Sequence, residues 1–536
     1  MMLPEDMRLW VGKDHLVWFV IDVIGGLDIT ALEALGRPGK GRPGYDPRMM
    51  AVLLIYSYLQ AERSSRRIEE RCRTDAAFRV ATGNLVPDHS TICRFRAEAA
   101  HAGGPLEDLF CRVLFVLASA GLGRLDVISV DGSKIWADAS KQANRTEEGL
   151  RKLSRKILDE AARADGEDCS CDGHGHGEAA GLDGPAACGC CDRGMLPGLG
   201  LDGPAVPRAG WGGATRAQRI AAGLAELEAA RLEREAARRA AAEAYLAAAR
   251  DKHAPPGGVP AEIAAEVALL RLEHATAAAA ATDARYAAAG RRKPGRRREG
   301  SEPAGVRKAR ERLAAAVQAR KDREAAQAAQ DGKKNKPQPV RNITDPDSRL
   351  MHCTLRGLVQ AFNAQARRAR DGAFLLPRVV RDPGDARQVA TAFEDIARSQ
   401  EIIAAGHAAG GHPGFWSRAG TVLADPGYFS RENLELPGPG RLIGAGGGWT
   451  DATPQHSPAC SHDDPRDQMA HDLSTRQGRD LYRNRAPLSE GGFADLKERT
   501  GLRRFAMRGI RKAQGELLLA CTAANIHLLY RRTRLA

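Results

Sequence analysis

The chain has 536 residues, room for three or four average domains, so a single small module is excluded. Its 80 lysines and arginines outnumber its 67 aspartates and glutamates, and the net charge of +13 favours a polyanionic partner, either nucleic acid or an anionic membrane surface. The 57 glycines and 28 prolines are too few to make the whole chain low-complexity, and no apolar run is long enough to cross a bilayer.

The opening residues lack the basic and apolar regions of an export signal, so we expect a cytoplasmic protein with no membrane partner. Most of the 11 cysteines should then be reduced thiols, because that compartment is reducing and an odd number cannot all pair within one chain.

Residues 13–115 carry the helical period and predict a small all-α unit. Leu16, Phe19, Val20 and Val23 fall on one expected face, and residues 49–59 predict a buried helix behind the start signal GRPGYDP.

Two serines at 64 and 65 then introduce a basic segment, and residues 87–96 predict a second basic helix. A helix, a turn and a basic helix are typical of units that place the last helix in the major groove of DNA. We therefore expect Thr91, Arg94 and Arg96 to face phosphates or base edges. The alternative is that Ile92, Cys93 and Phe95 are core and that the arginines form a solvated face.

Residues 125–136 form an apolar, β-branched run that predicts a buried strand. From 143 to 338 the composition changes to glycine-rich tracts and long stretches of Ala, Arg and Glu, which predicts an insertion. Helices are expected at about 216–250, 260–289 and 303–330, the first two as a hairpin and the third with heptad-like spacing of Val306, Leu313 and Val317. The basic turn 290–300 is either a DNA contact or a solvated loop.

After residue 339 the sequence predicts strands again, at 357–369 and 373–380 around an Asp371-Gly372 turn. A helix at about 385–405, strands at 421–425 and 441–444, a loop at 445–470 and helices over 474–533 follow. Asn363 and Gln365 share one face of their strand, where their amides either bind DNA or complete a polar network; we favour the network.

Two of the predicted strands each bear an aspartate at or near their C-terminal end, Asp131 and Asp425. Carboxylates that converge there can bind Mg²⁺, and with a third, for which Glu490 is best placed, two ions can drive phosphoryl transfer. The alternative is that both aspartates only cap the turns before Gly132 and Gly427.

Six strings, in five regions of the chain and in order, resemble the bacterial insertion-sequence DDE transposases. The N-terminal strings are YDPRMMAVLLIYSYLQAERSSRRIEERC and LVPDHSTICRFR, and the others are VISVDGSKIWADASK, TDPDSRLMHCTLRGLVQAFNAQ, VLADPGYFSRENL and the tail YRNRAPLSEGGFADLK. Two departures are Phe362 in place of the family's usual tyrosine and Gly491-Gly492 in place of its proline and hydrophobic residue. Two helical glycines weaken a helix by about 1 kcal/mol each relative to alanine, so this copy is either active or impaired.

The resemblance implies an α/β fold: a ribonuclease-H-like mixed sheet flanked by helices, with an N-terminal all-α domain and a long α-helical insertion. The implied domains are 1–118 for DNA binding, 119–142 for the first part of the catalytic core, 143–338 for the insertion and 339–536 for the rest of the core. Asp131, Asp425 and Glu490 would be the catalytic residues and would hold two Mg²⁺ ions, for which Mn²⁺ can substitute. Tyr482, Arg485 and Lys497 would contact DNA, and Lys134 would either do so or be exposed.

The insertion also contains a cluster of potential zinc ligands at Cys169, Cys171, His174, His176, Cys188, Cys190 and Cys191. Its C-x-C and H-x-H spacings are tighter than those of usual zinc sites, so the alternative is a variable linker without metal.

The sequence therefore predicts a transposase that binds inverted terminal repeats and target DNA as a homodimer and is nucleoid-associated when bound. Two alternatives remain. One is a decayed copy that acts only as a DNA-binding repressor, and the other is a two-metal nuclease of the same fold.

Overall fold

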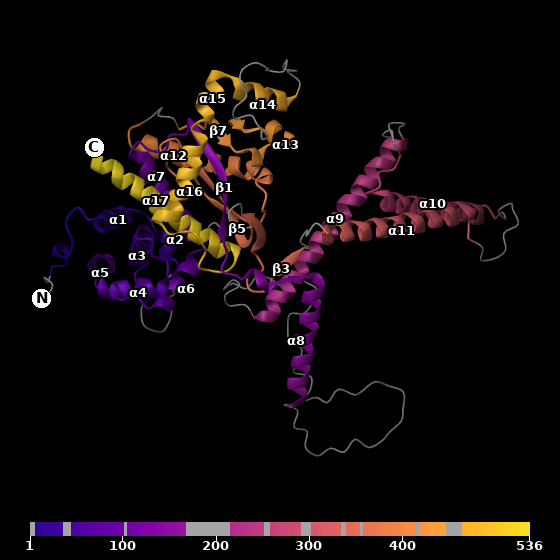
Figure 1. Ribbon diagram of the computed structural model, residues 1–536, viewed down its shortest axis with the longest axis horizontal. Helices are drawn as coiled ribbons and strands as arrows, with labels where there is room; N and C mark the ends of the chain where they lie inside the picture. The colour runs from indigo at the N-terminus through magenta and orange to yellow at the C-terminus, as the bar shows by residue number, and fades with distance from the viewer. Residues whose placement is uncertain are drawn as a thin grey trace. The chain divides into compact units, whose positions relative to one another are not determined.

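The computed structural model describes residues 6–35, 44–100, 104–167, 215–250, 258–290, 302–333, 339–353, 357–412, 417–445 and 464–535 (Figure 1). These residues form two compact units. The first holds the described residues up to Asn144, those of 215–219 and those from Arg341 on. The second holds the remaining described residues between 145 and 340.

The first unit begins with helices that start where the sequence supplies a cap. Asp46, Asp75 and Asp88 each accept a hydrogen bond from a backbone N–H two residues on, which satisfies the first turn of α3, α5 and α6. The elements are η1 (Met7–Leu9), α1 (Leu16–Gly25), α2 (Thr30–Glu33), α3 (Pro47–Leu59), α4 (Ser65–Thr74), α5 (Ala76–Ala81), α6 (His89–Ala99) and α7 (Pro105–Ser119). The predicted all-α unit is thus confirmed.

One of these helices differs in detail from the expectation, and another confirms it. Of the face predicted for α1, Val20 is buried, and Leu16, Phe19 and Val23 are partly buried against the core. The other buried residues are Val17 and Ile24, so the most buried face lies about one residue round the helix. In α3, every residue from Met50 to Leu59 is buried, so this helix is enclosed on all sides.

A mixed sheet follows, with β1 (Val127–Trp136) in the middle. On one side β5 (Gly357–Ala369) runs antiparallel to β1 and pairs with β4 (Arg349–Cys353) and β6 (Arg378–Val380). On the other side β7 (Thr421–Ala424) runs parallel to β1, and β8 (Gly440–Ile443) runs parallel to β7. The predicted strand at 373–380 is shorter than expected, because only 378–380 pairs as a strand with β5.

Helices cover both faces of this sheet. Ile128 and Val130 belong to the core that includes α12 (Val389–Ala409), which follows η3 (Ala386–Gln388). Val127, Leu423 and Leu442 point to the other face, where Met469, Tyr482 and Leu488 pack on them. The remaining elements of this part are η4 (Pro426–Tyr428), α13 (Arg431–Glu435), α14 (Pro465–Ser474), α15 (Arg476–Tyr482), α16 (Arg485–Ala494), the π-helix η5 (Asp495–Arg499) and α17 (Ile510–Leu535). The expected loop at 445–470 is wrong over 465–470, which α14 occupies.

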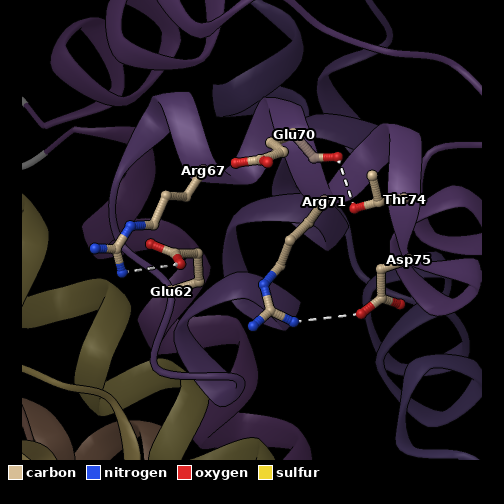
Figure 2. Close-up of a pocket in the computed structure, with 6 residues that line it drawn as sticks. All are labelled: Glu62, Arg67, Glu70, Arg71, Thr74 and Asp75. Atoms are coloured by element: carbon tan, nitrogen blue, oxygen red, sulfur yellow. Dashed lines mark hydrogen bonds and ion pairs between the residues drawn. The ribbon is translucent and has the colours of Figure 1, made fainter.

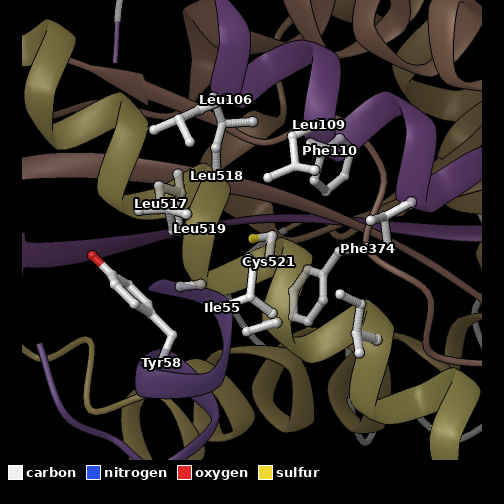
Figure 3. Close-up of a cluster of buried hydrophobic side chains, with 14 of the residues drawn as sticks. Ile55, Tyr58, Leu106, Leu109, Phe110, Phe374, Leu517, Leu518, Leu519 and Cys521 are labelled. Atoms are coloured by element: carbon white, nitrogen blue, oxygen red, sulfur yellow. The ribbon is translucent and has the colours of Figure 1, made fainter. Parts of the chain in front are cut away.

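Helix α17 fills the centre of the first unit. Leu517, Leu518 and Cys521 are at most 2% exposed, and they lie among side chains of α3, α7 and the segment after β5 (Figure 3). The core is therefore shared by the N-terminal helices and the elements around the sheet.

The second unit is helical. It contains α8 (Glu147–Glu167), most of α9 (Arg216–Arg250), α10 (Ala264–Ala288) and α11 (Ala304–Lys333), and α10 and α11 lie side by side (Figure 1). Ala242 of α9 packs on Val267 and Leu270 of α10, and Arg239 pairs with Glu273 at 3.0 Å. Val317 is 38% exposed, so the expected heptad seam of α11 is wrong at this position.

Short elements stand where the chain passes between the units: η2 (Lys141–Ala143), and β2 (Asn144–Thr146) paired with β3 (Val340–Asn342). Among the helices described, none is long and apolar enough to span a membrane.

Candidate active site

Asp131 and Asp425 are neighbours on two parallel strands. Asp425 directly follows β7, as expected, whereas Asp131 lies in the middle of β1, because this strand continues to Trp136 in its pairing with β5. The register pairs Ser129 with Leu423 and Val130 with Ala424, so Asp131 on β1 is level with Asp425, the residue after β7. Since the side chains of a strand alternate between faces, both aspartates lie on the face that carries Ser129 and Leu423. This is the face covered by α15 and α16.

Each aspartate uses one oxygen for its turn. Asp131 Oδ1 accepts a hydrogen bond from the Gly132 N–H at 2.7 Å, and Asp425 Oδ1 accepts one from the Gly427 N–H at 2.9 Å. Within the described residues, neither Oδ2 accepts a hydrogen bond. The turn-capping alternative is thus correct as far as it goes, but it leaves one oxygen of each carboxylate for another ligand.

The two aspartates carry like charges, which repel one another. Burial and then the charge of Asp425 raise the pKa of Asp131 to about 6. Burial and then the charge of Asp385 raise the pKa of Asp425. A divalent cation relieves such repulsion, and carboxylate oxygens are the ligands that Mg²⁺ prefers, so the donor set fits this ion.

Two residues predicted to contact DNA lie where β7 ends. Tyr482 Oη donates a hydrogen bond to the carbonyl of Ala424 at 3.1 Å, and the Arg485 guanidinium lies 5.8 Å from the centre of the Tyr482 ring. The positive charge of Arg485 lowers the pKa of both aspartates, against the larger effect of burial. Arg485 is therefore close enough to the carboxylate pair to meet an anion that approaches it.

Helix α16 and the π-helix that continues it cross β1 on either side of Asp131. The Oγ atoms of Ser489 and Ser129 are 2.5 Å apart, and Lys497 Nζ donates to Ser133 Oγ at 2.9 Å. Ser129 and Ser133 lie two residues before and two residues after Asp131 on the same strand face. Burial lowers the pKa of Lys497.

Glu490 follows Ser489 on α16, and its side chain is exposed. It has no hydrogen bond or ion pair to any described residue. The register brings Asp131 and Asp425 together, and the charge of Glu490 is not among the causes that shift the pKa of either aspartate. Gly491 and Gly492 lie in the second half of α16.

Asp385 is a fourth carboxylate at the site, and the sequence did not single it out. It lies just before η3 and accepts hydrogen bonds from Asn363 Nδ2 at 2.7 Å and Gln365 Nε2 at 2.8 Å. The Lys134 ammonium is 3.3 Å from both of its oxygens. The predicted polar network of Asn363 and Gln365 is confirmed, and the expectation of an exposed Lys134 is wrong, because only 16% of this side chain is accessible.

This network explains the glycine after Asp131. A Cβ atom at Gly132 would stand 2.3 Å from Gln365 Nε2 and 2.5 Å from Asp385 Oδ1, so these hydrogen-bonded side chains would have to move to admit it. Gln365 in turn accepts a hydrogen bond from Tyr428 Oη at 2.6 Å, and Tyr428 lies in the turn that follows Asp425. The buried network therefore connects the two turns that carry the aspartates. The Asp-Gly pair together with the amides of Asn363 and Gln365 was the one sequence signal that pointed to it.

The predicted DNA-binding residues of α6 separate into two groups. Arg94 is exposed and Thr91 is half-buried, whereas Arg96 is 3% exposed and donates to the carbonyl of Arg63 at 2.8 Å. The expectation that Arg96 faces DNA is therefore wrong, since its guanidinium is used inside the helical unit. Of the alternative core set, Ile92 is buried but Cys93 is exposed.

A surface cavity of about 510 Å³ lies along α4, where Arg67 points toward Glu62 and Arg71 toward Asp75 (Figure 2). Their ion-pair distances are 3.8 and 3.3 Å. Because its arginines are matched by carboxylates, this cavity is not a simple anion site.

Among the described residues, one group of three potential ligands has all its ligand atoms within 4.8 Å of one another: Glu69, Asp88 and His89. Its members already serve other contacts, because Asp88 caps α6 and Glu69 pairs with Arg73. The cysteine and histidine cluster at 169–191 and the basic turn from residue 291 to 300 lie outside the described residues.

Comparisons with known protein families give one match near each end of the chain. Residues 5–98 match a family described as a transposase domain (DUF772), and residues 453–530 match a family described as a transposase DDE domain. No curated protein and no solved structure matches the chain. The first match covers the N-terminal helices through most of α6, and the second contains Tyr482, Arg485, Glu490 and Lys497.

A DDE domain acts on DNA with a divalent metal ion. The chain thus carries a transposase domain before the sheet and a transposase DDE domain after it, which indicates a nucleic-acid-processing enzyme and is consistent with an insertion-sequence DDE transposase.

Proposed function

We propose that this chain is a transposase that binds the inverted terminal repeats of its element and carries out Mg²⁺-dependent DNA cleavage and strand transfer, with Asp131, Asp425 and Glu490 as the catalytic residues. The observation that carries the proposal is the level placement of Asp131 and Asp425 on parallel strands, under a helix that bears Glu490. The central β1, antiparallel to β5 and parallel to β7, supports a ribonuclease-H-like catalytic core.

The chain's own residues have distinct roles in this proposal. Asp131, Asp425 and Glu490 would hold two Mg²⁺ ions, which supply Lewis-acid chemistry for phosphoryl transfer when bound. Arg485 and Lys497 place positive charge near the carboxylate pair, where phosphate oxygens approach. Tyr482 supports the end of β7 through its bond to Ala424.

DNA recognition is assigned to the N-terminal helices, with the exposed Arg94 of α6 and the half-buried Thr91 toward the duplex. A homodimer on paired ends and a domain organisation of 1–118, 119–142, 143–338 and 339–536 are part of the same proposal.

The test compares purified full-length protein with its Asp131→Asn and Asp425→Asn variants on DNA that contains the element's ends. Both variants should lose Mg²⁺-dependent cleavage, by about 10³-fold or more, while their affinity for end DNA stays within about threefold of wild type. Asp480→Asn is the matched control, because this aspartate of α15 is exposed and, among the described residues, forms ion pairs with Arg476 and Arg483.

Unchanged cleavage by Asp131→Asn would remove the catalytic assignment. If wild type binds the ends but cleaves with neither Mg²⁺ nor Mn²⁺, the chain is a decayed copy that acts as a repressor. Cleavage without any preference for end sequences would favour the two-metal nuclease.

A further inference from the structure

The two glycines beside Glu490 face one particular side chain. Gly491 and Gly492 lie in α16, where glycine weakens a helix by its conformational freedom. An ideal Cβ atom at Gly491 would stand 3.3 Å from Arg368 Nη1, and one at Gly492 would stand 3.2 Å from Arg368 Cδ. Both approaches are tighter than ordinary van der Waals contact, so the glycines admit the arginine against the helix.

Arg368 lies on β5 opposite Ser129 of β1, and so on the sheet face that carries Asp131. Its Nη1 donates to the carbonyl of Leu488 at 3.3 Å, and its Nη2 donates to Asp495 Oδ2 at 2.9 Å. Leu488 and Asp495 stand on either side of Glu490 and the two glycines. One guanidinium therefore spans the part of the helix that contains Glu490.

The same side chain is fixed from the sheet side. Arg368 Nε donates to the carbonyl of Gly372 at 2.9 Å, and the guanidinium lies 5.3 Å from the centre of the Phe374 ring. Only 16% of the Arg368 side chain is accessible. A side chain held at both ends in this way transmits the position of β5 to α16.

We propose that Arg368 is a positioning residue that holds α16 against the sheet and thereby sets the place of Glu490 relative to Asp131, with Gly491 and Gly492 providing the space for its guanidinium. This inference rests on the function proposed above. The contacts of Ser489 with Ser129 and of Lys497 with Ser133 fix the helix along β1, and Arg368 fixes it over β5. Gly491-Gly492, which departs from the family pattern, then makes room for an arginine of the sheet beneath α16, and does not impair the site.

The first experiment compares Arg368→Ala with Arg370→Ala in the full-length protein. Arg370→Ala is the matched control, since it removes the same charge two residues along the chain. The Arg370 side chain pairs with Asp126 at the surface. We expect Arg368→Ala to lower Mg²⁺-dependent cleavage of end DNA by 10- to 100-fold, on the order of the effect of small misplacements in active sites, and to raise the Mg²⁺ concentration for half-maximal rate. Affinity for end DNA should not change. Arg368→Lys should restore part of the rate, because it can reach one acceptor.

The second experiment tests the fit between the arginine and the glycines. Gly492→Ala alone should lower cleavage, because the new methyl group displaces Arg368. In Arg368→Ala the same change should do no further harm and should restore part of the rate, because alanine strengthens a helix that no longer has to admit a guanidinium. Additive losses in the double variant would overturn the proposed fit.

A readout that does not depend on catalysis separates this inference from the proposed function. Amide hydrogen exchange in residues 485–499 should be faster in Arg368→Ala than in wild type and unchanged in Arg370→Ala. Unchanged exchange overturns the inference even if cleavage falls. Faster exchange with normal cleavage and normal Mg²⁺ dependence also overturns it, because the helix would then be held without effect on the site. If wild type never cleaves DNA, but exchange in residues 485–499 still differs between wild type and Arg368→Ala, the proposed function is contradicted. The inference that Arg368 holds α16 against the sheet is then kept.

Discussion

Lys134 lies on the strand of Asp131, but its ammonium serves Asp385 on the opposite face of the sheet. Lys134→Met should leave the Asp385 carboxylate with its two amide donors and without a counter-charge. Its negative charge would then add to those of Asp131 and Asp425, whose pKa values it already raises. We expect cleavage to fall by about tenfold or more, with no loss of affinity for DNA.

Cleavage and DNA binding measured on the same preparation decide between the two roles of Lys134. A lysine that contacts phosphate would instead weaken DNA binding and reduce its salt dependence, with little change in the rate at saturating DNA.

Asp345, in the segment before β4, makes stability depend on pH. It is fully buried, and burial raises its pKa from 3.8 to about 6, although the N–H groups of Gly509 and Asp347 donate to it. The folded protein therefore holds this proton more tightly than the unfolded chain does. The resulting stabilisation is complete below about pH 4 and is lost as the pH rises through about 6.

We expect the free energy of unfolding of wild type, relative to Asp345→Asn, to fall by about 2 kcal/mol between pH 4 and pH 7, since asparagine does not titrate. Urea unfolding at several pH values measures this difference. A difference that stays constant or grows with pH would contradict the assignment.

At the scale of elements, α6 separates surface from core within one helix. Arg94 is exposed, whereas Arg96 donates to Arg63 and Ser65 of the preceding segment. Arg94→Ala should weaken binding to end DNA and lower the slope of log affinity against log salt by about 1, with no change in thermal stability.

Arg96→Ala should instead lower the free energy of unfolding by about 2 kcal/mol, because buried carbonyl and hydroxyl groups lose their donor. Titrations of end DNA at several salt concentrations, with melting curves of the same samples, measure both effects. Equal loss of DNA affinity without loss of stability in Arg96→Ala would show that this arginine reaches DNA after all.

Elements differ in how far their sequence determines their role. The strands before Asp131 and Asp425 were predictable, because an apolar run that ends in a carboxylate and a glycine carries its signal within ten residues. The burial of Arg96 was not predictable, because periodicity separates the faces of a helix but does not say which polar side chain turns inward. The partners of Arg96 are 31 and 33 residues away in the sequence. Asp385 was harder still, since Lys134 is 251 residues away and only the fold brings the two together.

At the scale of the whole molecule, one core joins the N-terminal helices to the elements around the sheet. Leu518 of α17 is 2% exposed, near Leu106 and Phe110 of α7 (Figure 3). Leu518→Ala should lower the free energy of unfolding by about 2–5 kcal/mol. Because the core is shared, hydrogen exchange in α3 and in β1 should accelerate together.

Leu232→Ala is the control for this prediction, since Leu232 lies on α9 and is 55% exposed. Faster exchange confined to either α3 or β1 would mean that the two regions unfold independently in spite of their common core.

The central place of α17 also affects how the protein folds during its synthesis. Residues 510–535 follow the N-terminal helices and every strand in chain order, so they leave the ribosome after all of them. Until then, the apolar sides of α3 and α7 that α17 covers have no partner and are open to chaperones. The helices assigned to DNA recognition and the strands assigned to catalysis therefore complete their folding in the same step. A nascent chain that still lacks α17 has neither activity.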